Sequence, residues 1–331
     1  DFYELFFDDA INVSRELELT LTGKDCGQAE RAPMCGIPYH AAETYISRLI
    51  SKGYKVAICE QLEDPKKAKG IVKRDVIRVV TPGTVMESNL LEEKKNNYLM
   101  CIYKSGIFYG VTVCDISTGD FRTTQIKDNN NFALLMDEIS RYSPAELIVN
   151  PMMYECSEEI EKIRTRFDVY ITKLEEEEFA ENEDTTAIAY NLVNDNDDKV
   201  DSFDGMELCR FSTNAMIRYL QDTQKTNLDH INKLVIYNVT KYMSLDIKIT
   251  EKLRDKSKKG TLLWVLDKTA TAMGGRMLRR WLSDPLVDDV QINKRLNAVE
   301  ELKNNIILRG DITEALKKVY DIERLAGKIA Y

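Results

Sequence analysis

Histidines and paired cysteines are scarce in this sequence. It has two histidines, His40 and His230, and none of its seven cysteines forms a C-x-x-C pair. Zinc sites are built from Cys and His at short, regular spacings, so nothing here supports one. Seven cysteines cannot all pair within one chain, and Cys59 and Cys114 lie in apolar segments. We therefore predict reduced, buried thiols and a cytoplasmic protein.

Long apolar runs and nucleotide-binding loops are also missing. No run approaches the about 18 apolar residues that a membrane span needs, and no secretion signal is visible. Neither G-x-x-x-x-G-K-[ST] nor G-x-G-x-x-G occurs. The pair Gly274-Gly275 precedes a helical pattern, which indicates close helix packing rather than a phosphate site. The sequence thus predicts no cofactor, no metal and no membrane association.

Two residues invite a catalytic interpretation. Asp115 follows an apolar segment, where a carboxylate can hold Mg²⁺ in a nuclease, but the later strands offer no matching acid. We predict instead that Asp115 bonds the backbone of its own turn. His40 follows Cys35 closely and is expected to set a turn and a helix entry rather than to act as a base. No catalytic residue is expected, and a nuclease is kept only as a third alternative.

The charge of the chain is unevenly distributed. The net charge of −9 argues against nonspecific wrapping of nucleic acid. Residues 66–78, however, are strongly basic, and residues 175–184 are strongly acidic. The basic run is either a phosphate-binding patch or a solvated loop, whereas the acidic run is expected to be an exposed, mobile loop. The candidate phosphate-binding residues are Lys66, Lys67, Lys69, Lys73 and Arg74.

Three blocks predict an α/β multidomain protein. Residues 1–88 read as a small mixed α/β domain that ends in a turn. Residues 98–230 begin with a three-strand meander and continue with alternating helices and strands, which resembles a ribonuclease-H-like domain. Residues 231–331 open with a strand pair and are otherwise helical, as in part of a larger helical domain.

Hydrophobic periodicity gives the expected elements. Strands are expected at 2–7, 56–59, 76–80, 99–103, 108–114, 121–125, 147–149, 169–171, 234–237 and 242–245. Helices are expected at 10–19, 41–51, 132–141, 155–166, 205–221, 261–267, 273–282, 290–304, 312–319 and 322–329, with Gly310 separating two of the last.

The opening strand carries the most specific functional signal. Phe2 and Glu4 lie two residues apart, so they point to the same face of an extended strand. That face can present an apolar wedge beside a hydrogen-bonding acid, which suits a protein that tests a weak base step. A partly buried strand with alternating exposure explains the same nine residues without any function.

Several segments, taken together, resemble the MutS family of DNA mismatch-repair proteins. They occur in the family's order and at about its spacing, over essentially the whole chain. They are Asp1–Phe6, Ala32–His40, Val56–Gln61, Arg78–Thr84, Asp115–Gly119, Leu262–Asp267 and Met273–Leu278.

The resemblance implies a mismatch-recognition domain at 1–88, a connector domain at 98–230 and part of the core or lever domain at 231–331. The Phe of the family's F-x-E motif stacks on the mispaired base, and its Glu hydrogen-bonds to that base; these roles fall on Phe2 and Glu4. The implied partners are mismatched double-stranded DNA, a MutL-type protein that docks on the connector, and a second copy in the full-length, nucleoid-associated bacterial protein. ATP and Mg²⁺ belong to the family's ATPase domain, which is expected to lie beyond residue 331, so this chain is expected not to be an enzyme.

Two departures from the family pattern limit what the chain is expected to do. The helix and strand that normally precede the F-x-E segment are missing. The segment 244–251 is also shorter than the corresponding segment of the family. We therefore expect a monomeric N-terminal fragment with weak, salt-sensitive DNA binding and little mismatch preference by itself. The alternative function is a protein-interaction module that docks MutL through its connector.

Overall fold

The computed structural model describes residues 2–27, 30–64, 70–129, 132–194, 203–226, 228–239, 250 and 258–330. Two compact units divide the chain. The first comprises residues 1–82 with the short segment 223–225, and the second comprises residues 83–222 and 226–331. The domain limits at 88, 98 and 230 stay predictions. No helix in the described ranges is long and apolar enough to cross a membrane.

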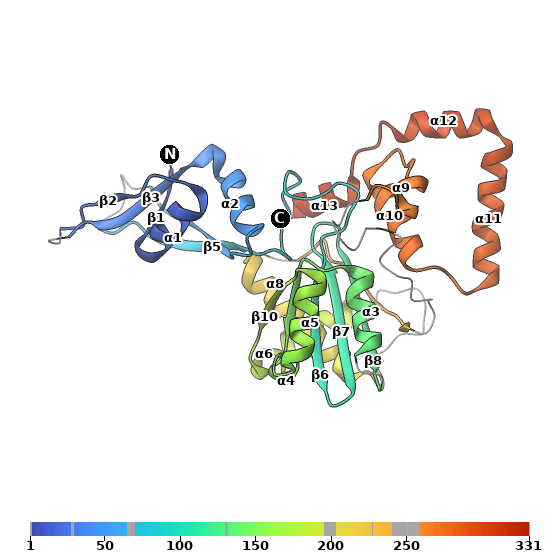
Figure 1. The fold of residues 1–331 in the computed structure, drawn as a ribbon, viewed down its shortest axis with the longest axis horizontal. Helices are drawn as coiled ribbons and strands as arrows, with labels where there is room; N and C mark the ends of the chain where they lie inside the picture. The colour runs from blue at the N-terminus through green and yellow to red at the C-terminus, as the bar shows by residue number, and fades with distance from the viewer. Residues whose placement is uncertain are drawn as a thin grey trace. The chain divides into compact units, whose positions relative to one another are not determined.

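The first unit contains two separate β-sheets (Figure 1). Strand β3 is the centre of a three-stranded antiparallel sheet with the order β1-β3-β2, and β4 pairs with β5 alone. The elements are β1 (Phe2–Phe6), α1 (Phe7–Leu17), β2 (Thr22–Lys24), β3 (Ala32–Pro38), the 3-10 turn η1 (Tyr39–Ala41), α2 (Ala42–Ile50), β4 (Val56–Gln61) and β5 (Arg74–Val80).

Most of these elements agree with the periodicity, but the strands β2 and β3 and the exposure of Cys59 do not. The strands β2 and β3 were not expected, because Gly23, Pro33 and Gly36 interrupt any strand-like pattern. The turn η1 confirms the expected helix entry at His40. The expectation that Cys59 is buried is wrong. Successive side chains of β4 point to opposite faces of the strand, and Cys59 lies on the exposed face.

A six-stranded mixed sheet forms the centre of the second unit, with the order β10-β9-β6-β7-β8-β11. Strands β6 to β8 are an antiparallel meander, while β9 and β10 run parallel to β6 on its other side. This is the ribonuclease-H-like arrangement expected from the sequence. The strands are β6 (Leu99–Ser105), β7 (Phe108–Asp115), β8 (Asp120–Lys127), β9 (Glu146–Val149), β10 (Tyr170–Lys173) and β11 (Leu234–Ile236).

Helices cover both faces of this sheet (Figure 1). Apolar residues of α3 (Ala133–Tyr142), α4 (Pro151–Tyr154) and α5 (Ser157–Phe167) pack on one face with Met100, Ile102 and Val111. Residues of α6, α7 and α8 pack on the other with Leu99, Cys101 and Cys114. These helices are α6 (Glu176–Phe179), α7 (Glu183–Asn194) and α8 (Glu207–Gln224).

The acidic run 175–184 is therefore not a mobile loop. It contains α6 and the start of α7, and Phe179 is buried in the core. The sequence did not indicate that Phe179 is buried, because the charged residues around it leave no hydrophobic periodicity in this run.

The last part of the second unit is helical, as expected. Its helices are α9 (Leu262–Leu266), α10 (Ala272–Ser283), α11 (Asp289–Asn304), α12 (Ile306–Leu316) and α13 (Ile322–Ala330). The expected start of a helix at residue 312 is wrong: Asn305 caps α12 by accepting a hydrogen bond from the Leu308 N–H, and Gly310 lies inside the helix. β11 pairs with β8, whereas the expected strand 242–245 and nearly all of the shortened segment 244–251 lie outside the described residues.

Candidate nucleic-acid interface

The strand β1 presents alternate side chains to opposite faces. Tyr3 and Leu5 pack against the core of the first unit. Phe2, Glu4 and Phe6 consequently lie on the outer face, where Phe2 is 65% exposed. A large apolar ring is costly to leave in water, so its position beside a carboxylate marks this face as a binding candidate.

The neighbouring strands complete the outer face. Residues opposite each other in an antiparallel ladder share a face, and Gly36 lies opposite Glu4. A β-carbon at Gly36 would stand 3.3 Å from Cδ1 of Phe2, so the ring lies directly over this glycine. The absence of a side chain at this position gives Phe2 its place on the sheet.

Glu4 has a cationic partner from the far strand of the sheet. Nζ of Lys24 lies 2.6 Å from Oε2 of Glu4, and the two side chains are 47% and 38% exposed. The same Nζ lies 5.1 Å from the centre of the Phe6 ring. Sequence reasoning missed Lys24, because a three-residue strand centred on glycine gives almost no periodic signal.

On the opposite side of β1, Tyr3 connects the two sheets of the first unit. Its hydroxyl donates a hydrogen bond to the Glu60 carboxylate of β4, and its ring stacks on Tyr39 with 5.4 Å between the centroids. Partial burial, with the nearby Glu60 charge, raises the pKa of Tyr3 well above its ordinary value. These contacts of Tyr3 on the inner face fix the position of β1, and with it the positions of Phe2 and Glu4 on the outer face.

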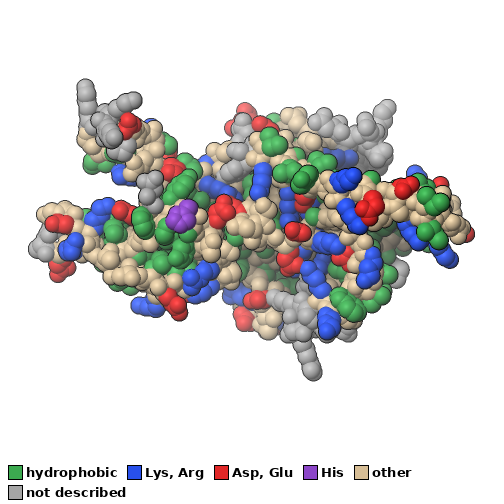
Figure 2. Space-filling model, turned by 90° about the horizontal axis from the view of Figure 1, so that it is seen from above, with side chains coloured by type: hydrophobic (Ala, Val, Ile, Leu, Met, Phe, Trp, Pro, Cys, Tyr) green, Lys and Arg blue, Asp and Glu red, His purple; other side chains and the backbone are tan. Residues whose placement is uncertain are grey.

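The candidate phosphate-binding residues are not all placed. Lys66, Lys67 and Lys69 lie outside the described residues. Lys73 and Arg74 are exposed near the start of β5; the Lys73 N–H donates to Glu63, and Arg74 donates to the Val72 carbonyl. These two hydrogen bonds stay within the β4–β5 hairpin, and neither reaches Phe2 or Glu4. Basic and acidic side chains are interspersed over the face in Figure 2.

Three family models match the chain in succession. MutS domain I matches residues 1–89, MutS domain II residues 97–232 and MutS domain III residues 243–331. The chain belongs to the MutS family. 

Relatives of known name agree with this assignment. The DNA mismatch repair proteins MutS of Ruminiclostridium cellulolyticum and Acetivibrio thermocellus are each 52% identical over 99% of this chain. The MutS protein of Alkaliphilus oremlandii is 52% identical over all of it. The chain spans 38% of the length of each of these three relatives.

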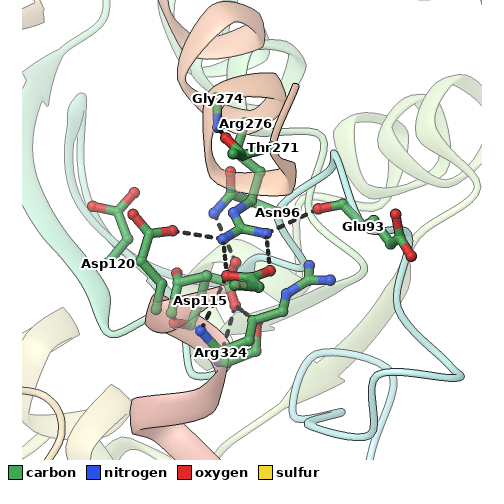
Figure 3. Close-up of polar contacts among 12 residues, drawn as sticks. Glu93, Asn96, Asp115, Asp120, Thr271, Gly274, Arg276 and Arg324 are labelled. Carbon is green, nitrogen blue, oxygen red and sulfur yellow. Dashed lines mark hydrogen bonds and ion pairs between the residues drawn. The ribbon is translucent and has the colours of Figure 1, made fainter. Parts of the chain in front are cut away.

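A cluster of arginines in MutS domain III binds the segment between the matches to domains I and II (Figure 3). Arg276, almost fully buried on α10, donates to the Glu93 carbonyl at 2.8 Å and to both carboxylate oxygens of Asp321 at 2.7 Å. Arg324 of α13 donates to the carbonyls of Glu92 and Lys95 at 3.1 and 2.7 Å. We call these six residues, with Asp115, the polar joint.

Asp115 lies at the buried end of the polar joint (Figure 3). One carboxylate oxygen accepts from the backbone N–H and hydroxyl of Ser117, and the other from Asn96 and the Asn97 N–H, at 2.7 to 3.2 Å. Burial raises the pKa of Asp115 despite these bonds. The expectation that Asp115 bonds its own turn is confirmed. No group of three or more metal-ligating side chains occurs in the described part of the chain.

The pair Gly274-Gly275 belongs to the same region. The Gly274 N–H donates to the capping Thr271 hydroxyl at 2.9 Å, and a β-carbon at Gly275 would lie 2.5 Å from Cγ of Lys94. The expected close helix packing is confirmed, and it brings α10 against the segment that the arginines bind.

Proposed function

We propose that this chain senses mispaired bases in duplex DNA, with Phe2 as the wedge that stacks on the mispaired base and Glu4 as the group that hydrogen-bonds to it. The relatives named as mismatch repair proteins and the match to MutS domain I support this function. The observation that carries it is the exposed Phe2 ring beside Glu4 on one face of β1, with Tyr3 packed behind.

The physics of a mispair suits this arrangement. A mispaired step stacks and pairs weakly, so kinking it costs less than kinking matched DNA. An apolar side chain inserted in the minor groove stabilises such a kink, and stacking contributes about 1–3 kcal/mol per base. The charge of Glu4 disfavours approach to phosphates unless a displaced base offers a donor. Discrimination then comes from duplex deformability and one polar test, so the role is one of binding rather than catalysis.

A fluorescent base tests the wedge directly. A heteroduplex with 2-aminopurine at the mispair is titrated with the chain at two salt concentrations, beside the matched duplex. We expect a stacking-dependent fluorescence change that Phe2→Ala removes, with a loss of heteroduplex affinity of about 5- to 100-fold. Phe108→Ala, an exposed phenylalanine of the second unit, is the matched control. An unchanged signal in Phe2→Ala contradicts the proposal.

A second candidate function is docking of a MutL-type protein on the second unit. An open depression of about 930 Å³ between α3 and α5 favours it, because such a surface can accept a protein loop. It is lined by Met136, Ser157, Glu158, Glu161, Lys162, Thr165 and Arg166. If docking is the main activity, Glu161→Lys with Thr165→Arg abolishes capture by a MutL-type protein and Phe2→Ala does not. Capture that survives the double change refutes docking at this surface.

A further inference from the structure

We propose that Lys24 is a specificity-determining residue, which holds the Glu4 carboxylate on matched DNA and exchanges it for a phosphate when a mispaired base takes Glu4. This inference rests on the proposed function of Phe2 and Glu4. It adds a residue from a different strand and gives it a role in discrimination.

The sheet register places the two groups for this exchange. Lys24 lies opposite Ala32 and Glu4 opposite Gly36, so both come from the outer face of strands that flank β3. Nζ of Lys24 reaches Oε2 of Glu4 at 2.6 Å. Lys24 is also the last residue of an edge strand, where a long flexible side chain can turn outward.

The strength of the contact suits an exchangeable partner. Both side chains are about two-fifths exposed, and ion pairs in such settings are individually weak. The Phe6 ring, 5.1 Å from Nζ, keeps the ammonium near this face when Glu4 leaves. A hydrogen-bond donor on a displaced base can therefore compete for Glu4, and the released ammonium remains near the DNA.

The exchange changes how many phosphates the protein neutralises. On matched DNA, Lys24 stays paired with Glu4. The pair is electrically neutral, so it neutralises no phosphate and releases no counterion from the DNA. On mispaired DNA, Glu4 binds the base and Lys24 binds a phosphate. Each phosphate contact adds about 0.9 to the slope of log affinity against log salt concentration, so the heteroduplex complex should show a steeper slope by about that amount.

The test is a double-mutant cycle between Lys24→Met and Glu4→Gln, read by fluorescence anisotropy with both duplexes at several salt concentrations. In the unmodified chain the heteroduplex slope should exceed the homoduplex slope by about 0.9. Lys24→Met should abolish this difference. Glu4→Gln frees Lys24 on both duplexes, so it should tighten homoduplex binding several-fold and raise its slope to the heteroduplex value, and adding Lys24→Met should reverse that gain.

Lys52 provides a matched control. Its Nζ lies 2.6 Å from Oε2 of Glu16 in the same unit, with similar exposure. Lys52→Met should leave the slope difference intact. Equal slopes in the unmodified chain, or a difference that survives Lys24→Met, overturn the role of Lys24. Those results are distinct from a failure of the proposed function, in which Phe2→Ala would leave heteroduplex binding and the 2-aminopurine signal unchanged.

Discussion

The ring of Phe2 lies over Gly36, so closely that a β-carbon there would stand 3.3 Å from Cδ1 of the ring. Gly36→Ala should therefore move the ring by a few tenths of an ångström without disturbing the inward side chains of β1. We expect heteroduplex affinity to fall about 2- to 5-fold, a part of the full stacking contribution. Equilibrium titration measures the change, and far-ultraviolet circular dichroism should be unaltered.

Gly310→Ala is the control for this substitution. A β-carbon at Gly310 meets nothing within 4 Å, and the residue lies inside α12. It should leave DNA binding unchanged. If Gly36→Ala binds heteroduplex as well as the parent chain does, the position of the Phe2 ring does not matter for binding.

Tyr3→Phe should destabilise the first unit. The change removes the hydrogen bond to Glu60 that links the two sheets, and bonds to charged groups in partly exposed positions are worth about 1–2 kcal/mol. Since the pKa of Tyr3 is raised above 10, its hydroxyl stays protonated to a higher pH in the folded state than in the unfolded state. The stabilisation is thus complete below about pH 10 and is lost as the pH rises above it.

Urea unfolding of the first unit at pH 8 measures the loss of stability in Tyr3→Phe. The same measurement at pH 10.5 shows whether the stabilisation by Tyr3 decreases at high pH. Tyr39→Phe keeps the ring stack with Tyr3 and is the control. Equal stability of Tyr3→Phe and the parent chain at pH 8 would show that the hydrogen bond to Glu60 contributes nothing to folding.

The sequence was informative wherever hydrophobic periodicity is local. The two-residue period of Phe2–Phe6 correctly separated the outward from the inward side chains of β1, and the meander β6–β8 followed from three alternating segments. The periodicity located most helices within a few residues. The placement of Phe2 and Glu4 on one face was therefore predictable, while their roles stay a proposal.

The missed features depend on contacts that no local pattern records. The central strand β3 is interrupted by Pro33 and Gly36, and Lys24 meets Glu4 only because both strands pair with it. Arg276 reaches the Glu93 carbonyl across 183 positions of the sequence. Such pairs depend on how the elements pack, which periodicity does not specify.

Gly110→Ala should strongly destabilise the second unit. Gly110 lies in β7, where an added β-carbon would come within 1.9 Å of the Leu208 carbonyl oxygen at the start of α8. Backbone atoms cannot yield as a side-chain end can, so we expect a loss of about 3 kcal/mol or more. Chemical denaturation followed by far-ultraviolet circular dichroism measures this loss of stability. A loss below about 1 kcal/mol would mean that α8 moves away without cost.

Acid should loosen the polar joint through Asp321. Burial by itself raises the pKa of Asp321, but the hydrogen bonds and charge of Arg276 outweigh it and leave the pKa below the ordinary value of 3.8. The carboxylate therefore contributes stability that is present above about pH 4 and is lost as the pH falls toward the lowered value. The free energy of unfolding of the second unit, measured between pH 6 and pH 3, should fall less in Asp321→Asn than in the parent chain. Glu314→Gln, which alters an exposed ion pair with Lys317, should retain the parent dependence. If the free energy of unfolding of Asp321→Asn depends on pH as that of the parent chain does, the contact with Arg276 does not stabilise the ionised Asp321 carboxylate in the folded state.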